Sequence, residues 1–378
     1  MNARHWLDWC KHLLKNIAVA AVLLSLSLSL SGAWFDFGSS DQSSRKSALA
    51  QGDAITDPTS LLRYALPIDN DTIRQFQEDI ETMSKYLRGK RWGALSSNVK
   101  DASRILRIRR DQILASIPEA DQVEASALID ELAEDVGELR ESVDAKDKEE
   151  IWTRRRDILN HVSDLEQLMV QEFPFDVPEE YANLPQLKGR ATVKMETTKG
   201  NLTVIVDGYS APVNAGNFVD LVQRGFYDGL EFIPSEDFVV QAGDPPGPEE
   251  GFIDPDTGEY RAIPLEVLIR GEEQPRYGTT LEDAGIYLPE LVLPFNAYGA
   301  IALARPGTDP NGGSSQFFFF KFDSELTPPG FNVMDGRYSV FGYVDQGQEV
   351  LADLAEGDKI LSAKVINGAE QLVEPRKA

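Results

Sequence analysis

The spacing of apolar residues along this chain changes at three closely spaced prolines. Before them the spacing is typical of helices, and after them it is typical of strands. Residues 59–173 carry apolar side chains three and four positions apart, which is the period of amphipathic helices. Pro174, Pro178 and Pro185 end that pattern, because proline lacks a backbone N–H and clashes inside a helix. From Ala191 onward, short β-branched and aromatic runs alternate with glycine turns, as in strands. We therefore expect a helical domain followed by a β domain.

The helical half contains four amphipathic stretches with short connections, which predicts an antiparallel bundle. Asp71 is the predicted N-cap of the first helix, and Pro118 is expected in the first turn of the third. The predicted apolar faces are Ile73, Phe76, Ile80, Met83 and Leu87; Leu95, Val99, Ala102, Leu106 and Ile113; Val123, Ile129, Leu132, Val136, Leu139 and Val143; and Ile151, Ile158, Val162, Leu165 and Met169.

The second half has many short strand patterns and few helices, which is typical of a β-barrel or sandwich. Pro212 is expected to open a short helix. The predicted strands are 193–196, 202–206, 238–241, 300–304, 317–320 and 338–344. Side chains alternate along a strand, so two of the four phenylalanines at 317–320 should point inward and two outward.

The first 50 residues are predicted to be a signal peptide and a linker. A basic segment precedes the apolar run 17–30, and small residues follow at 31–33, which is the order of a secretory signal. Three outcomes remain open for this segment: cleavage after Ala33, cleavage after Ala50, or retention of the apolar run 17–30 as a membrane anchor. The pattern predicts export from the cytoplasm.

Charge and composition argue against several functions. The chain has 37 Lys and Arg against 62 Asp and Glu, a net charge of −25, whereas nucleic-acid binding needs a basic face. Its one cysteine, Cys10, rules out an internal disulfide, and three histidines leave little for a metal centre. We expect no metal and no cofactor.

Arginines cluster on the second and fourth predicted helices, at 104, 107, 109 and 110 and at 154–156. They could form a surface for an anionic partner, or they could pair with the acidic third helix between Asp130 and Glu141. Pairing is the favoured interpretation, because opposite charges on neighbouring helix faces usually form solvated pairs. The loops 254–258 and 311–315 are expected to be ordinary turns, since they lack the EF-hand spacing and the phosphate-loop lysine respectively.

Several ordered blocks of the second half resemble the cyclophilin family of peptidyl-prolyl cis-trans isomerases. They are PVNAGNF at 212–218, FYDGLEF at 226–232, FVVQAGD at 238–244, GSSQFF at 313–318 and DGRYSVFG at 335–342. The resemblance implies an eight-stranded β-barrel capped by two helices. The expected fold is therefore α+β, with a leader at 1–50, an antiparallel helical bundle at 51–185 and a cyclophilin-like barrel at 186–378.

Within that family, the segments 61–70 and 177–181 and the long insert 251–298 are similar to the large two-domain cyclophilins of the thylakoid lumen. This similarity implies a cyanobacterial protein of the thylakoid lumen or periplasm that takes part in photosystem II assembly. The implied partners are proline-containing protein segments, including lumenal loops of photosystem II core proteins.

The resemblance also assigns a site, and this chain departs from it. The family has a histidine and the catalytic arginine after the phenylalanine that corresponds to Phe232, where this chain has Ile233 and Pro234. The residues that match the family's proline pocket are Phe238, Gln241, Ala304 and Phe318, with Met334 and Tyr338 at later pocket positions, Val333 at the family's tryptophan and Arg305 at its asparagine.

Two functions remain open at this point. The chain could be a binding chaperone with weak or no isomerase activity, which the absence of the arginine favours, or an active isomerase that assists the folding of exported proteins. Arg276, Arg305 or Arg337 could supply a substitute donor. Phe238 and Phe318 could also belong simply to the barrel core.

Overall fold

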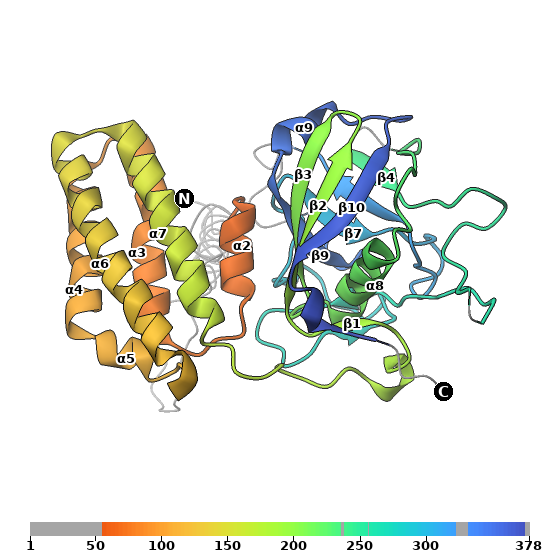
Figure 1. The fold of residues 1–378 in the computed structure, drawn as a ribbon, viewed down its shortest axis with the longest axis horizontal. Coiled ribbons are helices and arrows are strands. Elements are labelled where there is room, and N and C mark those ends of the chain that lie inside the picture. Colours follow the sequence, from red (N-terminus) through yellow and green to blue (C-terminus); the bar gives the residue numbers. More distant parts are fainter. Residues whose placement is uncertain (1–54, 236–237, 256, 323–331, 375–378) are drawn as a thin grey trace, which may run out of the picture. The chain divides into compact units, whose positions relative to one another are not determined.

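The computed structural model describes residues 55–235, 238–255, 257–322 and 332–374, and residues 51–378 make up one compact unit. The predicted leader lies outside the described residues. No helix in the described ranges is both long enough and apolar enough to cross a bilayer. Figure 1 shows helices in the first half of the chain and a curled sheet in the second.

The helical half is built mainly from α3, α4, α6 and α7, whose apolar stripes form one core. The helices are α2 (Pro58–Ala65), α3 (Asp71–Arg88), α4 (Trp92–Ile108), α5 (Arg110–Leu114), η2 (Glu119–Asp121), α6 (Gln122–Ala145), α7 (Lys148–Gln167) and η3 (Glu179–Tyr181). The predicted apolar faces are buried except at Val123, which is 83% exposed. Pro118 precedes the short helix η2, so α6 begins only at Gln122 and Val123 lies on the outer side of its first turn.

The N-cap of α3 is Asn70, so the prediction of Asp71 was wrong by one residue. Asn70 Oδ1 accepts hydrogen bonds from the backbone N–H groups of Thr72 and Ile73. Its Nδ2 also donates to the backbone oxygen of Gln112, at 2.9 Å. An ionised aspartate could not make this second bond, because it has no donor. The amide therefore both caps α3 and ties it to α5.

The first described helix, α2, packs against the strands. Leu61, Leu62 and Ala65 belong to one apolar cluster with Phe318 and Phe320. This helix falls inside the segment 51–185 that was predicted to form the bundle. The predicted boundaries themselves remain a prediction.

A buried ion pair joins α3 to α7. Arg74 Nη1 lies 3.2 Å from Glu166 Oε1, and Glu166 is fully buried. The same guanidinium donates to the backbone oxygens of Arg63 and Leu66 at the end of α2. Burial raises the pKa of Glu166 to about 7, and Arg74 opposes that shift. This single arginine thus connects three helices.

The β half is built on a seven-stranded antiparallel sheet, within the described residues, in the order β10-β2-β3-β9-β7-β8-β4. Two further two-stranded sheets pair β1 with β11 and β5 with β6. The strands are β1 (Gln186–Leu187), β2 (Arg190–Thr197), β3 (Gly200–Asp207), β4 (Val239–Ala242), β5 (Glu266–Val267), β6 (Arg276–Tyr277), β7 (Ala300–Leu303), β8 (Phe317–Phe320), β9 (Val340–Gln346), β10 (Ile360–Asn367) and β11 (Leu372–Val373).

Two isolated bridges connect the edges of the large sheet, in place of a regular eighth strand. Ile233 pairs with Gln241 of β4, and Glu231 pairs with Lys359 next to β10. The sheet is thereby curled toward closure. The helices of this half are α8 (Pro212–Gln223), which Pro212 opens as predicted, α9 (Gln348–Asp353) and η5 (Ala369–Gln371). Pro234 follows directly after the first of these bridges.

All four rings of β8 are buried, and they alternate between two apolar clusters. Phe317 and Phe319 lie in the main barrel core. Phe318 and Phe320 lie in the cluster that includes Phe295 and the α2 side chains. The predicted alternation is therefore present, but the outward-facing rings are covered by other parts of the chain.

The arginine cluster is paired in part. Arg110 binds Asp130 and Arg154 binds Glu138, both on α6, as the favoured interpretation expected. Arg155 instead donates to the backbone oxygens of Ile80 and Glu81 on α3. These contacts account for only some of the cluster.

We expect Glu166→Gln to reduce the pH dependence of stability. The pKa of Glu166 is about 7 in the folded chain against 4.5 unperturbed, so protonation favours the folded state. The contribution of Glu166 is complete below pH 4.5 and is lost as the pH rises through 7. Wild type should therefore lose about 2–3 kcal/mol of unfolding free energy more than the variant between pH 5 and pH 8.

Urea unfolding at both pH values measures this difference. Glu172→Gln, at an exposed position just after α7, is the control and should keep the wild-type pH dependence. An unchanged difference between pH 5 and pH 8 in Glu166→Gln would contradict the assignment.

Candidate functional site

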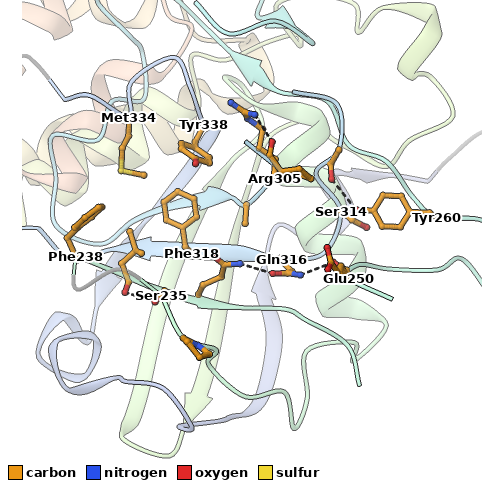
Figure 2. A pocket seen from close by; sticks show the side chains of 16 residues that line it. Ser235, Phe238, Glu250, Tyr260, Arg305, Ser314, Gln316, Phe318, Met334 and Tyr338 are labelled. Atoms are coloured by element: carbon orange, nitrogen blue, oxygen red, sulfur yellow. Dashed lines mark hydrogen bonds between the residues drawn. The ribbon is translucent and has the colours of Figure 1, made fainter. Parts of the chain in front are cut away.

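A pocket of about 800 Å³ opens on the barrel beside β4, β7 and β8. Figure 2 shows Phe238, Phe318, Met334 and Tyr338 around one end, with Tyr260 and Glu250 at the other. Its lining residues are Pro234, Ser235, Phe238, Val239, Gln241, Glu250, Tyr260, Ala304, Arg305, Pro306, Gly312, Ser314, Gln316, Phe318, Met334 and Tyr338. All six residues that the sequence suggested for a proline pocket are therefore brought together here, although their role remains a prediction.

The first end of the pocket is apolar and aromatic. Phe318 extends from β8 on the face opposite to the barrel core, and the ring of Tyr338 meets it edge-on at 5.3 Å between centroids. Phe295 stacks behind Phe318 at 6.0 Å. Phe238 is 38% exposed, so its ring is available to a ligand. Phe318, by contrast, is only 4% exposed and is part of an apolar cluster as well as of the pocket wall.

A chain of amide hydrogen bonds forms the polar floor. Gln241 Nε2 donates to Gln316 Oε1 at 2.7 Å. Gln316 Nε2 in turn donates to Asp244 Oδ1 and to the backbone oxygen of Glu250. Burial and the charge of Glu250 raise the pKa of Asp244. The orientation of the Gln241 amide is thus fixed by the chain itself.

Pro234 lines the pocket at the position of the family's catalytic arginine. Ile233 N donates to Gln241 O at 2.9 Å, which holds the preceding residue against β4. Proline has neither a side-chain donor nor a backbone N–H. This position therefore offers no hydrogen to a ligand.

Arg305 is the only arginine among the described lining residues, and its guanidinium is already bound. Nε donates to the backbone oxygen of Arg337, and Nη1 donates to that of Pro306, both at 2.9 Å. The guanidinium carbon lies 5.2 Å from the Tyr338 ring centroid. Arg305 thus fastens the wall that carries Tyr338.

The other two arginines considered from the sequence are engaged elsewhere. Arg337 pairs with Glu282 at 2.6 Å, and Arg276 pairs with Glu272 at 2.6 Å. Val333, at the family's tryptophan position, is 68% exposed and does not line the pocket.

A buried carboxylate supports the segment that carries Met334 and Tyr338. Asp335 Oδ1 accepts a hydrogen bond from Phe295 N at 2.9 Å. Burial raises the pKa of Asp335 to about 6, while hydrogen bonds from the Phe295 and Asn332 backbone oppose the shift. Asn332 Oδ1 also accepts from Met334 N. These hydrogen bonds therefore fix the backbone of the segment that carries Met334 and Tyr338.

Sequence reasoning missed the second end of the pocket. Tyr260 and Glu250 come from the region of the long insert, and Gly312 and Ser314 come from the glycine-rich loop that was predicted only as a turn. Tyr260 donates its hydroxyl hydrogen to Gly312 O at 3.0 Å. The run Gly312–Gly313–Ser314 was the available signal, because small residues often line a close approach.

The loop that was compared with a calcium site contains a backbone turn, with Gly258 N donating to Asp254 O at 2.7 Å. In the described ranges no group of three His, Cys, Asp or Glu side chains is arranged to hold a metal ion.

Comparison with known proteins agrees with this architecture. Residues 57–170 match the family model "Peptidyl-prolyl cis-trans isomerase CYP38-like, PsbQ-like domain". Residues 192–370 match the model "Cyclophilin type peptidyl-prolyl cis-trans isomerase/CLD". The expected order of a helical region followed by a cyclophilin domain is confirmed.

Three relatives are similar over most of the chain. A putative thylakoid lumen peptidyl-prolyl cis-trans isomerase of Synechocystis is 66% identical and covers 86% of each chain. The chloroplastic isomerase CYP38 of Arabidopsis thaliana is 45% identical over 87% of this chain and 78% of the relative. The chloroplastic CYP37 of the same plant is 33% identical over 83% of this chain and 70% of the relative. This chain therefore belongs to the cyclophilin-type peptidyl-prolyl cis-trans isomerase family.

Proposed function

We propose that this cyclophilin acts mainly by binding proline-containing protein segments in the barrel pocket, with weak or no isomerase activity. One observation carries the proposal. Pro234 stands at the position of the catalytic arginine, and the pocket's own Arg305 is bound to two backbone oxygens. The pocket therefore combines an apolar surface with a proline at the family's donor position, and its one described arginine has Nε and Nη1 bound to backbone oxygens.

Isomerisation requires more than an apolar pocket. The barrier to rotation about a peptide bond is about 18–20 kcal/mol, because amide resonance must be broken. A donor aimed at the prolyl nitrogen lowers that barrier by stabilising the twisted amide. Removing one preorganised donor commonly costs about 10²–10³ in rate. Because Pro234 has no donor, we expect this chain to show a rate loss of that size.

The apolar end is still suited to a proline ring. A ring with three methylenes gains about 2 kcal/mol when it is buried. Phe238, Phe318 and Ala304 offer this surface, and the Gln241 amide beside them is held in a fixed orientation. A gain of this size is small, so stable client binding needs further contacts with the chain.

The location and the clients follow from the similarity to lumenal relatives. We place the protein in the thylakoid lumen or periplasm after export, with the leader either removed or kept as an anchor. We propose a role in photosystem II assembly or maintenance, in which lumenal loops of the core proteins are the clients. The matched PsbQ-like model and the named thylakoid lumen relative support this assignment.

The second candidate function is an active isomerase that assists the folding of exported proteins. Family membership favours it, since the relatives are named as isomerases. For this function Arg305 would have to reach the peptide, either with Nη2 or by releasing Nε and Nη1 from the backbone oxygens of Arg337 and Pro306. An isomerase assay on a short X–Pro peptide separates the two candidates.

We expect residues 51–378 to catalyse X–Pro isomerisation at least about 10²-fold more slowly than a cyclophilin that has the arginine, while still binding a proline-containing peptide. Phe238→Ala should weaken that peptide binding about tenfold, because truncating an aromatic anchor costs more than about 1 kcal/mol. Titration calorimetry measures the affinity.

The control is Tyr287→Ala, since Tyr287 is 75% exposed and does not line the pocket. Equal peptide affinity in Phe238→Ala and wild type would exclude this pocket as the binding site. A turnover typical of the family would exclude the binding-only function.

We expect Pro234→Arg to raise kcat/KM by less than about tenfold, because a donor misplaced by about 1 Å loses roughly 10²-fold. The position follows the Ile233–Gln241 bridge, and the loop to Phe238 is one residue shorter than in the family. Pro234→Ala, which lacks the donor, controls for the loss of proline rigidity. Full family-level activity in Pro234→Arg alone would show that the arginine was the only missing element.

Clients can be identified by capture from solubilised thylakoid membranes on immobilised residues 51–378. Photosystem II core proteins should be recovered by wild type and depleted with Phe238→Ala. Recovery of unrelated exported proteins without photosystem components would contradict the proposed clients.

A further inference from the structure

The segment 85–110 has a charge opposite to that of the whole chain. It contains nine basic residues and one acidic residue, a net charge of +8, in a chain whose net charge is −25. The segment comprises the end of α3, the turn to α4, α4 itself and the start of α5. The surplus of positive charge is therefore concentrated in one helical hairpin.

Six exposed side chains make up what we call the basic stripe. They are Arg88, Lys90, Arg91, Lys100, Arg104 and Arg107. Within the described residues only Arg104 among them has an ion pair, with Asp101 at 3.7 Å and with both side chains largely exposed. The other five have no ion pair in that part of the chain.

Helical spacing places the centre of the stripe on one face. Lys100, Arg104 and Arg107 follow each other four and three positions apart, so they share a face of α4. The opposite face, with Leu95, Val99 and Ala102, is buried in the bundle core. At 1.5 Å per residue, Lys100 and Arg107 are about 10 Å apart along the axis of α4. Arg88, Lys90 and Arg91 lie at the end of α3 and in the turn before α4.

Neighbouring arginines show what internal pairing looks like in this bundle. Arg110 binds Asp130 and the backbone oxygen of Ser126, and Arg109 donates to Gln75 and Gln112. Within the described ranges, the only ion pair of the stripe is the exposed one between Arg104 and Asp101. Like charges four apart, such as Lys100 and Arg104, repel each other on a helix, and the exposed Asp101 offsets only part of this repulsion.

We propose that the basic stripe is a docking surface for an acidic segment of a partner protein. The row of cations on α4 is one helix wide and about 10 Å long, which matches two turns of an acidic helix or an extended segment of about four residues. Each exposed contact adds little alone, but a row of complementary charges raises the association rate and fixes register.

The neighbouring helix argues for a narrow protein segment over an anionic membrane. α4 packs against α6, as Figure 1 also shows, and α6 carries the exposed carboxylates Glu131, Glu134 and Glu141. A planar anionic surface that reached α4 would bring its own charge toward these carboxylates. A segment the width of one helix avoids them.

The test measures binding of a fluorescent polyglutamate peptide to residues 51–378 at low and at about 150 mM salt, where the Debye length is about 8 Å. A triple variant should weaken binding by about tenfold or more and reduce its salt dependence. It combines Lys100→Glu, Arg104→Glu and Arg107→Glu. The control combines Lys146→Glu, Lys148→Glu and Arg156→Glu, which makes the same change in net charge on the α6–α7 hairpin and should leave binding unchanged.

Thermal unfolding checks that both triple variants fold, and a glutamine triple at 100, 104 and 107 replaces the first if it does not. Absence of peptide binding by wild type, or equal loss in the control, would overturn the proposal. So would binding to vesicles of phosphatidylglycerol and phosphatidylcholine that matches peptide binding and is lost with the stripe, because the surface would then be a membrane contact.

Discussion

The burial of β8 on both of its faces is the constraint on which the barrel and the pocket both depend. Phe317 and Phe319 fill the barrel core, while Phe318 and Phe320 pack against Phe295 and α2 on the other side. A strand in a solvated sheet would alternate apolar and polar residues, and this strand has no polar residue at all. The four rings therefore require a second apolar layer outside the barrel.

That second layer also forms the wall of the pocket. Phe318 is held between the stacked ring of Phe295 and the edge of Tyr338. Tyr338 is fixed by Arg305, and the adjacent backbone is fixed by Asp335. In this chain Arg305 thus positions an aromatic ring. Its hydrogen bonds to backbone oxygens thus contribute to the shape of the pocket.

Much of this arrangement follows from local sequence, and the exceptions have physical causes. Periodicity predicted the helix faces and the two sides of β8, because those patterns depend on neighbours along the chain. It failed at Val123, where α6 begins later than Pro118 suggested. It could not place Tyr260 in the pocket, because that depends on a hydrogen bond to Gly312, about fifty residues away. The packing of α2 on β9 is likewise a long-range contact with no local pattern.

The six residues suggested by family resemblance line one cavity, and their role in binding remains a prediction. The family blocks account for only part of the lining of that cavity. Phe238, Ala304 and Phe318 lie at the end that the family blocks cover, whereas Glu250 and Tyr260 come from the region of the insert. Composition was similarly incomplete. The net charge of −25 is that of the whole chain, whereas the basic stripe lies at the end of α3, in the turn after it and on α4. Net charge is a sum, and a sum does not report how charge is divided among helices.

The barrel pocket and the basic stripe would contribute to binding through different interactions. A partner that contacts both could therefore bind well even though the pocket alone binds weakly. Burying a proline ring supplies about 2 kcal/mol and depends little on salt. The charges of the basic stripe act over about a Debye length, raise the association rate and weaken as salt rises. When one partner engages two sites on the same chain, the second contact forms at a high effective concentration, so two weak contacts can give an affinity that neither has alone. Under the proposed function, proline at position 234 is compatible with client binding, because binding, unlike isomerisation, needs no group aimed at the prolyl nitrogen.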